Sequence, residues 1–134
     1  MTKKGTILLI EDDQNLTFGI KTALEYEGFL GIACSHIFDI TNILSRTNPD
    51  LVLCDYWLKE ESIQSILNFI KNKHPNPIPF VLMSGDPGIK KISSDLNIPF
   101  FIKKPFDSDE LFSIINLALD FYKRSDFSLL NAVN

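Results

Sequence analysis

The chain has 134 residues, of which 45% are hydrophobic and 22% are charged, and its formal net charge is -4 at pH 7. This length predicts one domain that buries a core without disulfides or metal staples. The acidic balance argues against direct binding of nucleic acid, which needs a basic face. No secretory leader or membrane-spanning run is evident, so we expect a soluble protein with no membrane partner. Cys34 and Cys54 lack metal-ligand spacing and read as buried thiols of a reducing compartment, so we expect a cytoplasmic location.

Short apolar runs alternate with amphipathic stretches along the whole chain. The apolar runs predict strands over residues 7–10, 29–34, 51–55, 80–83 and 99–102. Apolar residues at helical spacing predict helices over residues 16–24, 37–44, 63–70, 89–96 and 107–122. Asp107 and Glu110 have the spacing of a capping box at the start of the last helix. We therefore expect one domain over residues 1–124 and a tail, or the start of a linker, over residues 125–134.

Five strand–helix units in succession predict an α/β fold with a doubly wound, five-stranded parallel sheet. Right-handed crossovers then place helices on both faces of the sheet. The carboxyl ends of the strands share one edge in such a fold, and ligand crevices form there. The polar residues expected at this edge are Glu11, Asp12, Asp13, Asp55, Ser84, Lys103 and Lys104.

The residue types expected at this edge are those that phosphoryl transfer requires. Asp55 ends a continuous apolar strand, and a carboxylate in that place is able to attack phosphorus. Neighbouring carboxylates repel one another unless a cation relieves them, and Mg2+ prefers oxygen ligands. A lysine neutralises a transferring phosphoryl group, and the Ser84 hydroxyl is able to donate a hydrogen bond to it. The alternative is that Asp55 and its neighbours are ordinary turn residues exposed to solvent.

Four motifs, in order, resemble those of the receiver domain of bacterial two-component response regulators. The resemblance covers residue 5 to about residue 122. Glu11 and Asp12 resemble the acidic pair of the family, and residues 49–55 resemble the segment that ends in the phospho-accepting aspartate. Residues 83–85 resemble the hydroxyl position, and residues 104–106 resemble the lysine–proline pair. The resemblance implies a flavodoxin-like fold and a cis peptide bond before Pro105.

The resemblance also implies a magnesium site. Asp12 and Asp55 would ligate Mg2+, and Glu11 would reach the ion through water. The backbone carbonyl of Trp57 would complete the ligands from the protein.

A signalling role follows from the same resemblance. Asp55 would attack the phosphohistidine of a histidine kinase or a histidine phosphotransfer protein, and Lys104 would assist, with Lys103 as an exposed neighbour. Ser84 would then turn toward the phosphoryl group and Phe101 would move inward. The domain would act on a downstream protein target, with homodimer formation left open. Such a domain assists its own phosphorylation and dephosphorylation and is not a turnover enzyme.

The chain departs from the family pattern after Asp55. The family usually has a proline four residues after the acceptor and a glycine eight residues after it, where this chain has Lys59 and Ile63. We therefore expect an unusual path for the loop over residues 56–62. We also expect Trp57 to hinder the attacking water and to lengthen the lifetime of the acyl phosphate. The segment around the fourth helix is short and contains Gly88.

Three other readings compete with the phospho-accepting switch. A pseudo-receiver would use the fold only as a protein-interaction module, and the altered loop favours it weakly. An aspartyl-phosphate phosphatase would need a second acid two residues after the nucleophile, where Trp57 stands. A flavin-binding protein would need a hydroxyl- and glycine-rich loop after the first strand, which is absent. We expect His36 and His74 at the surface or at helix ends rather than as metal ligands.

Overall fold

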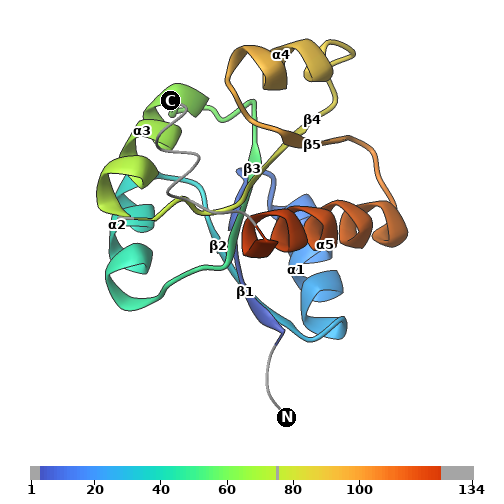
Figure 1. The fold of residues 1–134 in the computed structure, drawn as a ribbon, viewed down its shortest axis with the longest axis horizontal. Coiled ribbons are helices and arrows are strands. Elements are labelled where there is room, and N and C mark those ends of the chain that lie inside the picture. Colours follow the sequence, from blue (N-terminus) through green and yellow to red (C-terminus); the bar gives the residue numbers. More distant parts are fainter. Residues whose placement is uncertain (1–3, 75, 125–134) are drawn as a thin grey trace.

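The fold alternates strands and helices in the predicted order (Figure 1). The structure is a computed structural model and describes residues 4–74 and 76–124. The strands are β1 (Gly5–Ile10), β2 (Phe29–Cys34), β3 (Leu51–Asp55), β4 (Phe80–Ser84) and β5 (Phe100–Lys103). The helices are α1 (Gln14–Tyr26), α2 (Ile37–Arg46), α3 (Ile63–Lys73), α4 (Ile89–Asp95) and α5 (Ser108–Arg124). The predicted boundary at residue 124 stays a prediction, because residues 125–134 lie outside the described part.

One parallel sheet organises the molecule, with the strand order β2-β1-β3-β4-β5. This order confirms the predicted doubly wound, five-stranded sheet. The register pairs Ile10 of β1 with Cys54 of β3, so the acidic pair after β1 and Asp55 leave the sheet side by side. Ser84 at the end of β4 pairs with Lys103 of β5. All strands therefore deliver their carboxyl ends, with their polar residues, to one edge.

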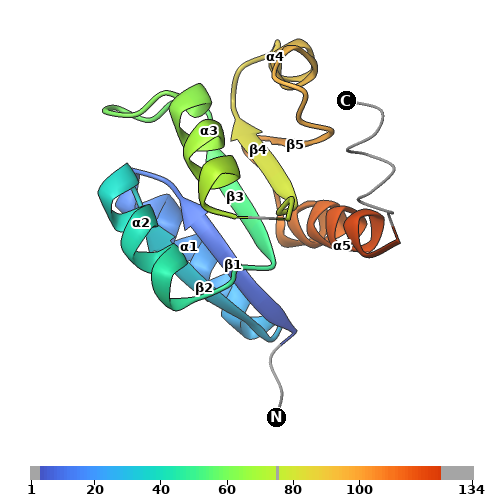
Figure 2. The same ribbon diagram turned by 60° about the vertical axis from the view of Figure 1, so that its left-hand side comes forward.

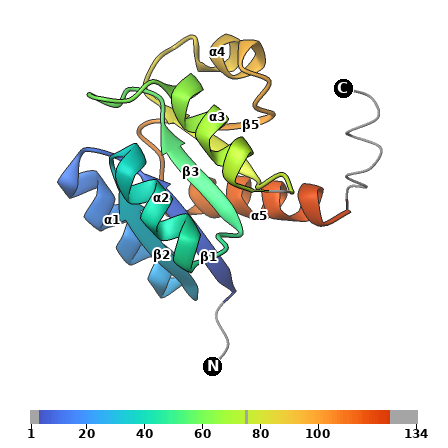
Figure 3. The same cartoon turned by 90° about the vertical axis from the view of Figure 1, so that its left-hand side faces the viewer.

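Two apolar cores lie on opposite faces of this sheet. Alternate strand residues, such as Leu9 and Leu53, pack with α1 and α5, while Leu8 and Val52 pack with α2, α3 and α4. Figure 3 shows α2 and α3 in front of the sheet, with α1 and α5 behind it. In Figure 2 a loop leads from the arrowhead of β4 to α4. Because both faces are covered, β3 and β4 are buried throughout.

Side-chain caps set the start of three helices. Asp13 accepts the Leu16 amide hydrogen bond at 3.0 Å and so caps α1. Ser62 caps α3 in the same way. The predicted capping box is confirmed, because Asp107 accepts from the Glu110 amide at 2.8 Å and Glu110 accepts from the Asp107 amide at 3.4 Å.

Two further expectations concern the short fourth helix and the peptide bond before Pro105. The helix α4 has seven residues and starts directly after Gly88. The Lys104–Pro105 peptide bond is cis, as predicted.

Within residues 4–74 and 76–124, no helix is both long enough and apolar enough to cross a bilayer.

Candidate functional site

A cavity of about 410 Å3 opens at the carboxyl ends of β1 and β3. Its lining contains four carboxylates, two lysines and one tryptophan: Glu11, Asp12, Asp13, Asp55, Trp57, Lys59 and Lys104. Five of the six residues predicted for the site, all except Ser84, are in this lining. The topology thus brings together groups that are up to 93 residues apart in sequence.

Lys104 bridges two buried carboxylates at the centre of the cavity. Its Nζ lies 2.7 Å from Oε1 of Glu11 and 3.0 Å from Oδ1 of Asp55. Only 4% of Glu11 and 5% of Asp55 are exposed. The ammonium group therefore neutralises charge in a place where water screens poorly.

The pKa directions of this pair follow from burial and contact. Burial raises the pKa of Asp55, and the Glu11 charge adds to the rise, so together they outweigh the opposing contact with Lys104. Burial by itself would lower the pKa of Lys104, but its hydrogen bonds to Glu11 and Asp55 raise it above the ordinary value. Ionised Asp55 is thus held at a cost, whereas charged Lys104 is stabilised.

The acidic pair after β1 divides its oxygens between backbone contacts and the cavity. Oε2 of Glu11 accepts the amide hydrogens of Asp12 at 3.0 Å and of Asp13 at 3.3 Å. Oδ2 of Asp12 accepts the Lys59 amide hydrogen at 2.7 Å. Oδ1 of Asp12 is buried and has no hydrogen-bond partner in the described part of the chain.

The donor set fits a hard divalent cation. A buried carboxylate oxygen without a partner is costly, and a cation would relieve it. Asp12 and Asp55 line the same cavity, and oxygen is the ligand atom that Mg2+ prefers. No three His, Cys, Asp or Glu side chains among residues 4–74 and 76–124 surround a common point as preformed ligands. Mg2+ commonly takes only one or two carboxylates and completes its shell with water and phosphate oxygens, so this arrangement is compatible with it.

The other residues to which a role was assigned from the sequence differ in burial. Ser84 is fully buried, and its Oγ accepts the Asp86 amide hydrogen at 3.0 Å. The Trp57 side chain is 65% exposed and stacks edge-on against Tyr56, with ring centroids 4.9 Å apart. Phe101 is half-buried against the core under α2, α3 and α4.

The loop after Asp55 is held by polar contacts. Besides the Lys59 amide bond to Asp12, Oε2 of Glu60 lies 3.1 Å from Nδ1 of His36, and Oε1 of Glu61 accepts the Ile37 amide hydrogen at 3.4 Å. These contacts tie the loop to the acidic pair and to the start of α2. His36 and His74 lie at helix ends, as expected.

Two cavity residues were not assigned a role from the sequence. Asp13 both caps α1 and lines the cavity, and its spacing to Leu16 is the signal that could have found it. Lys59 lies in an irregular loop that has no periodicity, and its amide bond to Asp12 spans 47 residues of sequence. No local pattern would have placed Lys59 in the cavity.

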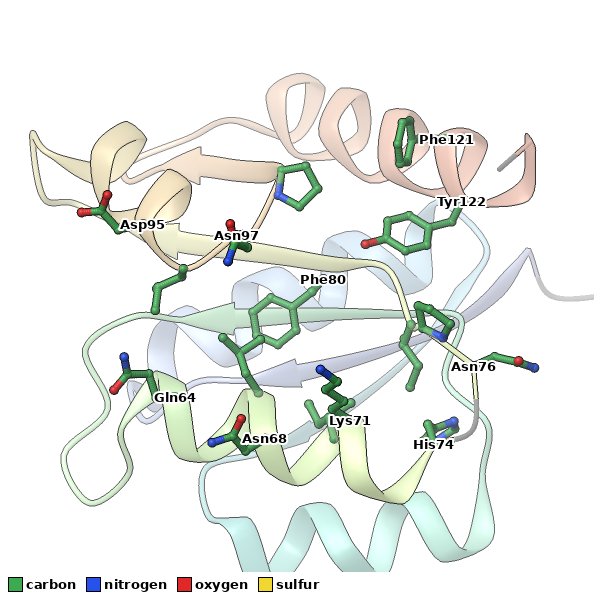
Figure 4. A pocket seen from close by; sticks show the side chains of 16 residues that line it. Gln64, Asn68, Lys71, His74, Asn76, Phe80, Asp95, Asn97, Phe121 and Tyr122 are labelled. Carbon is green, nitrogen blue, oxygen red and sulfur yellow. The ribbon is translucent and has the colours of Figure 1, made fainter. Parts of the chain in front are cut away.

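A second hollow, of about 990 Å3, lies away from this edge, between α3 and the end of α5. Figure 4 shows Asn68 and Lys71 of α3 on one side, Asn97 and Tyr122 on the other, and Phe80 between them. None of the acids and lysines of the first cavity lines it. The hollow is the larger of the two, but it lacks a cluster of buried charges.

Comparison with known proteins places this geometry in a family. The chain is 27% identical over 123 residues to the DNA-binding transcriptional regulator NtrC of Proteus hauseri, with 90% of this chain and 26% of the relative covered. It is 32% identical over 120 residues to the transcriptional regulatory protein VxrB of Vibrio cholerae, with 87% and 46% covered. The chain thus spans half or less of these relatives.

A solved structure and a family model agree with these relatives. The signal receiver domain of a signal transduction histidine kinase from Syntrophus aciditrophicus superposes with a TM-score of 0.75 at 27% identity, covering 91% of this chain and 95% of that one. The family model described as the response regulator receiver domain matches residues 7–116. The chain belongs to the response regulator receiver domain family, the signalling domains of two-component systems.

Proposed function

We propose that this chain is a phospho-accepting switch in which Asp55 receives a phosphoryl group from a phosphohistidine on a histidine kinase or a histidine phosphotransfer protein. The observation that carries the proposal is the Lys104 bridge between buried Glu11 and Asp55, beside the unpartnered Oδ1 of Asp12. Such an arrangement concentrates a nucleophile, a fixed cation and a vacant oxygen ligand at one point. A protein-interaction module without phosphoryl chemistry would not need it.

The transfer joins the Asp55 carboxylate to the phosphoryl group of the donor. A carboxylate oxygen of Asp55 attacks phosphorus and forms a new P–O bond. The P–N bond of the phosphohistidine breaks, and its electron pair stays on the imidazole nitrogen, which takes up a proton from solvent. Lys104 offsets the negative charge that the phosphoryl group brings to the buried site.

Mg2+ is part of the proposal. Asp12 and Asp55 would ligate it directly, Glu11 would act through water, and the Trp57 carbonyl would supply a further oxygen. When bound, the ion supplies charge neutralisation for the phosphoryl oxygens. Lys104 meanwhile holds Asp55 in place through its 3.0 Å contact, and Glu11 holds Lys104 at 2.7 Å.

The outcome of phosphorylation would be a shift in a conformational equilibrium. The Ser84 hydroxyl, now bonded to the Asp86 amide, would turn toward the phosphoryl group, and half-buried Phe101 would move inward. A downstream protein target, or a second copy of the chain, would read the change. The NtrC relative is named as DNA-binding, and we propose that nucleic acid is not a direct partner of the acidic region present here. The two free cysteines agree with a cytoplasmic location.

The direct test is intact-protein mass after incubation with acetyl phosphate, with and without Mg2+. We expect a gain of one phosphoryl group that depends on Mg2+ and is absent from Asp55→Asn. A matched control is Lys71→Gln, which changes an exposed charge in the second hollow and should leave the gain intact. No gain in the parent chain, including with phosphorylated kinase donors, would favour the pseudo-receiver.

A further inference from the structure

Lys59 occupies the cavity at a position where the family usually carries a proline. It lines the cavity together with Lys104, and its backbone is fixed by the 2.7 Å bond from its amide to Oδ2 of Asp12. A proline there could not make this bond, because it has no amide hydrogen. Compared with the usual proline, Lys59 thus adds both a backbone hydrogen bond and a positive charge.

The backbone of Lys59 is held, but its side chain is exposed and uncommitted. The neighbouring Glu60 and Glu61 tie the loop to His36 and to the amide of Ile37. Within the described part of the chain, the Lys59 ammonium makes no ion pair or hydrogen bond. The charge is therefore available to ligands that enter the cavity.

The charge balance of the cavity gives this ammonium a role. Lys104 is already shared between Glu11 and Asp55, so an incoming phosphoryl group meets a cation that is committed to two carboxylates. Asp12 keeps one buried oxygen without a partner. A second cation at the rim attracts an anionic phosphodonor and repels a divalent cation, because both bring charge to the same place.

Building on the proposed function, we propose that Lys59 is a second cation of the acceptor cavity, which speeds the reaction with anionic phosphodonors and weakens the binding of Mg2+. The two effects have opposite directions for one substitution. A substitution that merely disrupted the loop would weaken both the binding of Mg2+ and the reaction with phosphodonors. The opposition is therefore the signature of a charge effect.

The experiment compares the full chain with Lys59→Gln, Lys59→Arg and the control Lys103→Gln. Lys103 is exposed at the end of β5 and does not line the cavity. Trp57 is the one tryptophan of the chain and lines the cavity, so its fluorescence during a Mg2+ titration, without any phosphodonor, gives the dissociation constant. The rate with acetyl phosphate and saturating Mg2+ is then followed by intact mass.

For Lys59→Gln we expect Mg2+ to bind about threefold more tightly and acetyl phosphate to react about threefold more slowly at low salt. Both differences should shrink at high ionic strength, where charges are screened. Lys59→Arg and Lys103→Gln should match the parent chain. Equal Mg2+ affinities and equal rates for Lys59→Gln and the parent would overturn the inference. A variant in which the Mg2+ affinity and the reaction rate both fall, or both rise, would overturn it as well. A parent chain that takes up no phosphoryl group would overturn the proposed function instead, and the Mg2+ titration would then decide on Lys59 alone.

Discussion

The cavity at the carboxyl edge and the hollow between α3 and α5 differ in how deeply their charged side chains are buried. In the cavity, Glu11 and Asp55 are buried and share one lysine. In the larger hollow, Lys71 and Asp95 are exposed, and the floor is apolar, with Phe80 only 7% exposed. Buried charge is costly to maintain, whereas exposed charge costs little. The comparison teaches that convergent buried charge, rather than volume, marks the candidate functional site.

Truncating the floor of the hollow should affect stability alone. We expect Phe80→Ala to lower the free energy of unfolding by about 3 kcal/mol, because it leaves a void in a packed core. Urea unfolding measures the loss, with Asn68→Ala, at the exposed rim, changing stability by no more than about 0.5 kcal/mol. Phosphorylation by acetyl phosphate, measured well below the melting temperature of the variant, should be unchanged. A lost phosphoryl gain in folded Phe80→Ala would break the distinction between the two regions.

Removing the bridging lysine should lower stability, by an amount that depends on pH. Lys104→Met leaves two buried carboxylates without their cation, so we expect the free energy of unfolding to fall by about 2 kcal/mol at neutral pH. This is less than for a fully buried pair, because the lysine side chain is 22% exposed. Because the pKa of Lys104 is raised in the folded state, the contribution of Lys104 to the free energy of unfolding is complete below pH 10.5, the ordinary pKa of lysine. This contribution is lost as the pH rises through the pKa of the folded state. The free energies of unfolding of the parent and the variant, measured by urea unfolding, should therefore become equal in strong alkali. Lys103→Met is the matched control, and an equal loss in both variants would contradict the account.

Neutralising Asp55, the proposed acceptor, should raise stability at neutral pH. Because the pKa of Asp55 is raised, its ionised form is disfavoured in the folded state, and its contribution to stability falls as the pH rises above 3.8 through the folded-state value. We expect Asp55→Asn to melt at a higher temperature than the parent at pH 7, and the difference to narrow toward pH 3.8. Mg2+ should narrow the difference as well, by stabilising the parent. A lower melting temperature for Asp55→Asn at pH 7 would show that the Lys104 contact outweighs burial.

The smallest effect concerns the exposed indole of Trp57, which lines the same cavity as the proposed acceptor. If Trp57 shields the acyl phosphate from water, Trp57→Ala should lose its phosphoryl group faster after the donor is removed. Intact mass against time gives the half-life. Tyr26→Ala is a suitable control, since Tyr26 is 89% exposed and does not line the cavity. An unchanged or longer half-life for Trp57→Ala would remove the shielding role.

The fold was predictable because both sheet faces are buried and each strand reads as a continuous apolar run. The run at residues 7–10 marked β1, but the strand begins at Gly5, since Gly5 and Thr6 pair with Phe29 and Leu30. Such pairing leaves no trace in hydrophobicity. The meeting of Glu11, Asp55 and Lys104 followed from topology alone, because parallel strands share their carboxyl edge.

Side-chain orientation and loop path were beyond local patterns. Ser84 was expected at the edge, but nothing in the sequence indicates that its hydroxyl accepts from Asp86. Lys59 entered the cavity through a bond to Asp12, from a loop without periodicity. Such contacts depend on the assembled tertiary structure, and only the structure reveals them.

The most direct measurement of the central claim is the position of the phosphorylated residue. Reduction with borohydride converts an acyl phosphate into an alcohol, so peptide mass spectrometry after treatment with acetyl phosphate and Mg2+ locates it. The account predicts homoserine at position 55 and at no other carboxylate of the cavity. A modification at Glu11, Asp12 or Asp13, with Asp55 unmodified, would contradict it.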